Sequence, residues 1–193
     1  MGIAYCLVRT SPDVVEQLRE RPKALAKFLY PDDDVYEAPK PRLLAQLFGK
    51  KRALDTRPVP ARQDGDETDL DKSWHFVHYL LCGDTGRGEG PLALIGQDQH
   101  PLADLDLGLG KPNVISAASV RAFSEASAAL SDEDFLQRFQ PDVMPLNDLY
   151  LGQVVQRGEA DDIREYALEN FHGLRDFVRQ AADRDEALIT YYC

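Results

Sequence analysis

Apolar residues gather in short runs at the two ends of the chain, and both runs have the composition of β-strands. Residues 3–9 read IAYCLVR and Ala187–Tyr192 read ALITYY, which are β-branched and aromatic stretches of strand length. A third apolar run, residues 91–96 (PLALIG), suits another strand. Strands at both ends with helices between them are typical of an α+β domain. The sequence therefore predicts a small mixed sheet that includes both terminal strands.

Between these strands, apolar residues recur at helical spacing, and several helix starts carry their own signals. Ser11, Pro12 and Asp13 combine an N-cap, a proline suited to the first helical position and an early acid. That helix must end before Pro22, and residues 131–134 (SDED) resemble a capping box. About six helices are expected, and seven segments are candidates for them: one on each side of Pro22, and others over residues 42–48, 70–83, 117–130, 131–139 and 160–182.

One stretch breaks the apolar pattern. Residues 53–69 are rich in proline, glycine and acids and have no apolar period, which predicts a flexible surface loop. The length of 193 residues suits one domain, so we expect a single domain over residues 1–193 that contains this loop. At the end of the loop, Asp69 can cap the helix that follows.

The helix over residues 70–83, LDKSWHFVHYLLCG, is predicted to be the central buried element. Leu70, Trp74, Val77 and Leu81 follow the i, i+4, i+7, i+11 spacing, so they are expected to form its core face. Further apolar side chains occupy the other sides of this helix. A helix that is apolar nearly all round is typically buried.

A second row on the same helix carries the candidate chemistry. Asp71, His75, His78 and Cys82 repeat the spacing of the core face one step round, and all four are ligand or acid–base types. As a catalytic site, Cys82 would pair with His78, and Asp71 would orient His75. As a metal site, His75 and His78 would share one ion with Asp71.

The third interpretation of this row is structural, and we prefer it. The histidines would satisfy hydrogen bonds in the core beside Trp74, while Asp71 would complement the helix N-terminus. A metal pair at i, i+3 needs ligands from elsewhere, and the glutamate of an HExxH motif is missing. His100 and His172 are the remaining histidines that would complete a site. The glycine-rich residues 83–90 match neither a P-loop nor GxGxxG, so no cofactor is expected.

The charge of the chain is negative and unevenly spread. Residues 1–60 hold 11 Lys/Arg against 8 Asp/Glu, or +3, whereas residues 61–193 hold 11 against 25, or −14. A nucleic-acid binder needs clustered positive charge, so nucleic acid is not an expected partner. No apolar run approaches the roughly 18–20 residues that span a bilayer, so no membrane is expected either. The acidic part would instead attract a partner protein with a basic surface.

The cysteines and the N-terminal residues bear on the cellular compartment. Cys6, Cys82 and Cys193 are odd in number and scattered, which predicts two core thiols and one terminal thiol rather than a disulfide framework. The first residues, MGIAYCLVRTSPD, lack the pattern of a signal peptide. Both observations lead us to expect a cytoplasmic protein.

Five segments together resemble a known family along essentially the whole chain. They are MGIAYCLVRTSPD, FLYPDDD, LDKSWHFVHYLLCG, PLALIG and ENFHGLRDFVRQAADRDEALITYY. The resemblance is to the YfbM-like family, a bacterial domain of unknown function numbered 1877, and LDKSWHxxHxLLxG is its most specific piece. Asp71, Lys72, Trp74, His75 and His78 match the family pattern, whereas Cys82 stands at a variable position. The resemblance implies a single α+β domain in a bacterial cytoplasm and carries no activity, cofactor or catalytic residue.

These observations favour a binding protein over an enzyme. We expect a small acidic immunity or inhibitor protein that neutralises a toxin by occupying its basic cleft. The alternative is an enzyme or small-ligand-binding protein that uses the row of Asp71, His75 and His78. The alternative predicts that both histidines reach a solvent-accessible pocket, whereas backbone partners for the histidines would support the structural interpretation.

Overall fold

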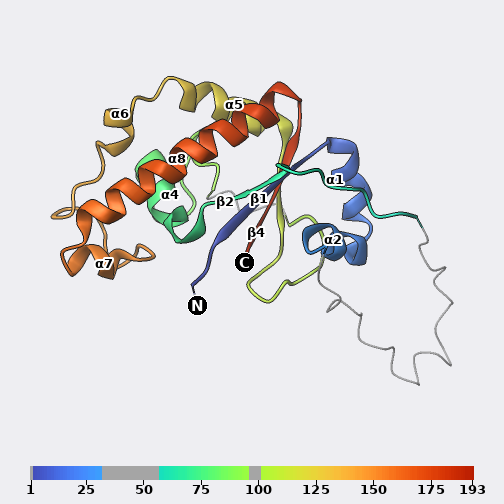
Figure 1. Ribbon diagram of the computed structural model, residues 1–193, viewed down its shortest axis with the longest axis horizontal. Coiled ribbons are helices and arrows are strands. Elements are labelled where there is room, and N and C mark those ends of the chain that lie inside the picture. Colours follow the sequence, from blue (N-terminus) through green and yellow to red (C-terminus); the bar gives the residue numbers. More distant parts are fainter. Residues whose placement is uncertain (1, 32–56, 96–100) are drawn as a thin grey trace, which may run out of the picture.

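A four-stranded sheet brings the two ends of the chain together (Figure 1). The computed structural model describes residues 2–31, 57–95 and 101–193. In strand order, the sheet consists of β2 (Glu67–Asp69), β1 (Tyr5–Thr10), β4 (Ala187–Tyr192) and β3 (Asn113–Ile115). The first and last strands pair directly, with Leu7 opposite Thr190. The α+β class and the meeting of both terminal strands in one sheet are thereby confirmed.

The direction of the strands differs from the prediction. Every pairing among the described strands is antiparallel, so the sheet is not the expected mixed one. The apolar pattern of a strand reports which of its faces are covered and says nothing about its direction. Strand direction was therefore beyond the reach of the sequence pattern.

Helices cover both faces of the sheet. α1 (Pro12–Arg19) and α2 (Pro22–Leu29) lie on one side, whereas the long helix α8 crosses the other side together with α4 and α5 (Figure 1). The remaining bounds are η1 (a 3₁₀ turn, Asp71–Ser73), α4 (Trp74–Cys82), α5 (Ala117–Ala128), α6 (Asp132–Leu136), α7 (Gly152–Gln156) and α8 (Ala160–Asp183). Within the described residues, none of these helices is both long and apolar enough to span a membrane.

Alternate residues of the central strands face two separate cores. Tyr5 and Leu7 of β1 join the core formed with α4, α5 and α8, whereas Cys6 and Val8 join the core formed with α1 and α2. All six residues of β1 are buried as a result. A strand covered on both faces is apolar at most positions, which explains the continuous run in the sequence.

The predicted helix starts are confirmed in detail. Ser11 caps α1 by accepting a hydrogen bond from the amide of Val14, and Pro12 occupies the first helical position. Pro22 ends the first helix and begins α2. Ser131 and Asp134 form a capping box at α6, because each side chain accepts a hydrogen bond from the backbone amide of the other residue.

Two segments differ from their expected structure. Residues 91–95 form turns rather than a strand, although Ala93, Leu94 and Ile95 are buried. A short apolar run reports burial alone, and here the burial comes from core packing without a strand partner. Glu67–Asp69, at the end of the expected loop, forms the edge strand β2, because backbone pairing with β1 requires no apolar side chains.

The expected absence of a disulfide is wrong. Cys6 and Cys193 form a disulfide that links residues 187 positions apart, and Cys82 is free. The bond is possible because β1 and β4 are neighbours in the sheet, which the spacing of the cysteines could not reveal. The expected helix over residues 42–48, the first residues of the expected loop (53–56) and His100 lie outside the described residues.

Candidate functional site

The central helix begins with a tight turn. Asp69 accepts a hydrogen bond from the amide of Asp71 at 2.8 Å, and the Ser73 hydroxyl donates to the carbonyl of Leu70 at 2.8 Å. Asp71 has a φ of 40°, in the left-handed region that few residues other than glycine enter, Asp and Asn more often than most. The helix ends at Gly83, whose φ of 77° suits a glycine C-cap. Two left-handed backbone positions therefore bracket the segment that carries the candidate row.

The face expected to form core lies largely inside the protein. Leu70, Val77 and Leu81 are buried, and Trp74 is half-buried. The Trp74 ring stacks on that of His75, with centroids 4.7 Å apart and an interplanar angle of 6°, and it also meets the ring of Tyr192 edge-on. Its indole nitrogen is buried without a hydrogen-bond acceptor in the described part of the chain.

Both ring nitrogens of His75 are occupied by backbone groups. The Nδ1 atom accepts a hydrogen bond from the amide of Tyr150 at 3.1 Å. The Nε2 atom lies 2.6 Å from the carbonyl oxygen of Thr85, so it must carry the proton and donate. His75 is thus a neutral imidazole that connects the loop after α4 to the segment before α7. Neither nitrogen is left to bind a metal or to transfer a proton.

His78 contacts the thiol of Cys82. The Nε2 atom lies 3.5 Å from the Cys82 sulfur, and the thiol also reaches the His78 carbonyl oxygen at 3.2 Å. Burial lowers the pKa of His78, while a backbone hydrogen bond with Gly86 and the charge of Asp84 oppose the shift. Burial raises the pKa of the Cys82 thiol. The pair is therefore a neutral thiol beside a neutral imidazole, which is a poor nucleophile.

Asp71 interacts with a tyrosine rather than with either histidine. The Tyr166 hydroxyl of α8 donates to the Asp71 carboxylate at 2.6 Å and accepts from the amide of Lys72 at 3.2 Å. Burial, followed by the hydrogen bond to Asp71, raises the pKa of Tyr166 to about 12. Asp71 and Tyr166 thus fasten the start of the central helix to α8.

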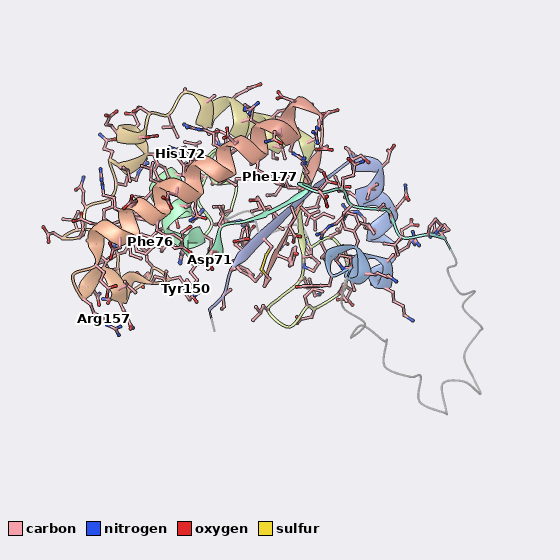
Figure 2. All side chains as sticks on the ribbon, viewed as in Figure 1. Asp71, Phe76, Tyr150, Arg157, His172 and Phe177 are labelled. Atoms are coloured by element: carbon pink, nitrogen blue, oxygen red, sulfur yellow. A yellow bond between two sulfur atoms is a disulfide. The ribbon has the colours of Figure 1, made fainter. Side chains whose placement is uncertain are left out.

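The structure divides the predicted row among three environments. Asp71 binds Tyr166, His75 binds two backbone groups, and His78 contacts Cys82. His172 lies on α8 and interacts with Asp132 at 2.8 Å, apart from Asp71 (Figure 2). Among residues 2–31, 57–95 and 101–193, no group of three or more metal-binding side chains comes together.

The small-ligand interpretation required a pocket that both histidines reach. One pocket in the described part of the chain, of about 320 Å³, lies between α2 and the segment before β2, with Phe28, Val59 and Arg62 in its lining. Neither His75 nor His78 contributes to that lining. The three partners that decide the environments of Asp71 and His75, namely Thr85, Tyr150 and Tyr166, had no signal in the sequence, because two are backbone groups and the third lies 95 positions away.

The buried His78 has a consequence for stability at mildly acidic pH. Its pKa is lowered in the folded protein, whereas the unfolded chain titrates near the ordinary value of 6.5. Below that value the unfolded chain binds a proton that the folded protein does not, so acid favours unfolding. We expect the free energy of unfolding to fall as the pH drops from 7 toward the lowered pKa, by at most about 1.4 kcal/mol per pH unit for this group.

Urea unfolding at a series of pH values checks this expectation. The variant His78→Gln removes the titrating ring, so its unfolding free energy should vary less between pH 7 and 5 than that of the unchanged protein. His172→Gln serves as the control because His172 is 41% exposed. Equal slopes for the unchanged protein and His78→Gln would show that His78 does not set the pH dependence.

The fold and the family agree. The protein has a three-layer α+β arrangement with a central helix that His75 and Tyr166 fasten in place. This arrangement identifies a class of domain and does not indicate a catalytic activity. The model of a domain of unknown function (DUF1877) matches residues 1–191, so the chain belongs to the DUF1877 family. Its fold is similar to the crystal structure of YfbM from Escherichia coli, a protein of unknown function, with a TM-score of 0.63 and 15% identity over 99% of each chain. No curated protein matches this chain.

Proposed function

We propose that this protein works by binding, and that an acidic surface at one end of the molecule recognises a partner protein with a basic surface. In this proposal the partner is a bacterial toxin in the cytoplasm, whose basic cleft the protein occupies and thereby neutralises. The distribution of exposed charge is the observation that carries the proposal. The separation of the candidate catalytic residues also supports the proposal, because it weakens the alternative of an enzyme.

The acidic surface comprises residues 131–169, which we call the acidic end. This segment holds ten Asp/Glu against three Lys/Arg, a net charge of −7, and all ten carboxylates are exposed. Among the described residues, none of the ten forms an ion pair with a lysine or arginine; Asp132 contacts His172. Carboxylates without cationic neighbours leave a strong negative potential at the surface.

The negative charge is concentrated at one end of the molecule. The acidic end includes α6, α7 and the first part of α8, which lie at the opposite end from α1 and α2, and Arg157 lies near its tip (Figures 1 and 2). Residues 11–31 hold four Lys/Arg against three Asp/Glu, or +1. An asymmetric field of this kind orients an approaching basic partner and raises its association rate.

Toxins that act on nucleic acid or nucleotides need basic clefts to hold phosphate, and an acidic protein can block such a cleft. Catalysis by the candidate row has less support, because His75 has both nitrogens bound to backbone and the Cys82 thiol has a raised pKa. A protein that inhibits by occupying its target needs no catalytic group.

The test compares two triple variants with the same change in charge. The first variant removes three negative charges from the part of α8 within the acidic end, by Asp162→Asn, Glu165→Gln and Glu169→Gln. The second removes three negative charges from α1 and its C-cap at the opposite end, by Asp13→Asn, Glu16→Gln and Glu20→Gln. Asp162 and Asp13 both lie in the first turn of their helices, so the effects on the helix dipoles are matched. The target is the purified product of a neighbouring toxin-like gene.

We expect the α8 triple variant to bind this target about 10-fold more slowly at low salt, and the α1 variant to bind nearly as fast as the unchanged protein. Stopped-flow mixing measures the rate, and growth rescue during toxin expression measures neutralisation. Equal losses in both variants would argue against the acidic end. The absence of both binding and rescue for every neighbouring gene product would overturn the proposal.

A further inference from the structure

The disulfide of this protein lies where the end of β4 meets the start of β1. Ala4 and Cys193 exchange two backbone hydrogen bonds, of 2.9 and 3.1 Å, and Cys6 lies opposite Tyr191 in the register of the two strands. Cys6 and Cys193 are therefore diagonal neighbours on one face of the sheet, with Cα atoms 6.5 Å apart. The sheet itself holds the two sulfur atoms within bonding reach, so the bond can open and close without refolding of the strands.

The two cysteines differ in their access to solvent. Cys193 is exposed, whereas Cys6 is 7% exposed and belongs to the core beneath α1 and α2. Thiol–disulfide exchange begins at the sulfur that an external molecule can reach. Cys193 therefore exchanges first with a solute, and Cys6 completes or reverses the bond from inside.

We propose that Cys6 and Cys193 form a reversible redox latch, which a low-molecular-weight disulfide closes and the corresponding thiol opens. In closing, the Cys193 thiolate attacks the external disulfide and releases one thiol, and the Cys6 thiolate then attacks the mixed disulfide and releases a second thiol. The two cysteines lose two electrons and two protons, and the external disulfide gains both. This latch does not depend on the proposed toxin partner.

The latch acts on residues that reach both faces of the sheet. Tyr191 donates a hydrogen bond to Glu67 of the edge strand β2 at 2.6 Å. Tyr192 packs edge-on against Trp74, with ring centroids 5.3 Å apart, and against Tyr5. Both tyrosines directly precede Cys193, so opening the bond leaves this end of β4 to non-covalent contacts alone. The contacts of β4 with the candidate helix and with the sheet edge therefore both depend on the redox state of Cys6 and Cys193.

The sole tryptophan of the chain provides a reporter beside the latch. The experiment uses the full-length chain with Cys82→Ser, which removes the free cysteine and leaves the latch intact. The protein is equilibrated in a graded series of reduced and oxidised glutathione, quenched with acid and labelled with maleimide. Mass spectrometry counts the labels, and Trp74 fluorescence is recorded in the same mixtures. The unchanged protein, carried through the same series, controls for the substitution.

We expect the labelled cysteines to fall from two to none across the series, and the Trp74 emission to change at the same glutathione ratio. Two labels in every mixture would mean that no disulfide forms, and no labels in excess reduced glutathione would mean that glutathione cannot reduce the disulfide. Either result would overturn the latch. Label loss without a fluorescence change, or linkage between two chains, would also overturn the latch. Cys6→Ser should abolish the fluorescence change while Cys193 still acquires a glutathione adduct.

Discussion

Replacing Phe171 with alanine should lower the free energy of unfolding by about 3–5 kcal/mol, the range for deleting a fully buried aromatic ring. Phe171 is 0% exposed on α8, and its ring stacks on that of Phe135 in α6, with centroids 4.1 Å apart. The guanidinium of Arg175 lies over the Phe171 ring at 5.1 Å. The substitution therefore removes packing from the contact that holds α6 against α8.

Urea unfolding measures this loss, with Phe139→Ala as the control. Phe139 is only half-buried, so the same substitution there should have a clearly smaller effect. Because α6 belongs to the acidic end, Phe171→Ala should also weaken binding to a basic partner at temperatures where the protein remains folded. Equal losses for the two variants would mean that the Phe135–Phe171 stack does not anchor α6.

The sequence predicted those parts of the fold that depend on neighbouring residues. Ser11 with Pro12, and Ser131 with Asp134, each lie within one helical turn, so local chemistry alone determines these helix starts. The continuous apolar runs of β1 and β4 similarly reflect burial of both strand faces. Such features require no knowledge of which distant segment arrives beside them.

Features that depend on distant segments escaped the sequence pattern. The Cys6–Cys193 bond requires the β1–β4 register, and β2 requires the free edge of β1 rather than an apolar composition. The candidate row has the spacing of one helix face, yet spacing does not show whether its side chains form hydrogen bonds with one another or with other segments. For His75 the partners are backbone groups, which leave no trace in residue types.

The composition of the candidate helix suggests a site for catalysis or ligand binding, whereas its contacts indicate a structural role. Asp71 and His75 are polar residues, and the hydrogen bonds of both fasten the helix to other segments. His75 is half-buried, and its two backbone partners favour one arrangement of the surrounding segments, because another arrangement would leave these groups unsatisfied. The helix is thus a junction between α8, the loop after Gly83 and the segment before α7.

The sharpest test of this junction is His75→Ala, which should lower the free energy of unfolding by about 2–4 kcal/mol. The substitution leaves the Tyr150 amide and the Thr85 carbonyl without their partner, and each unsatisfied buried backbone group costs about 1–3 kcal/mol. It also removes the ring that stacks on Trp74. Partial access of water to this half-buried site keeps the total below the sum of the upper values.

His172→Ala is the matched control, because the same side chain is deleted from an exposed pair with Asp132 and should cost about 0–1 kcal/mol. Urea unfolding measures both variants. Nitrogen-15 NMR of the histidine rings adds a direct test, since the hydrogen bonds require His75 to carry its proton on Nε2 and none on Nδ1. A His75→Ala protein as stable as the unchanged one, or a ring protonated at Nδ1, would remove the structural role and return His75 to the candidates for catalysis or ligand binding.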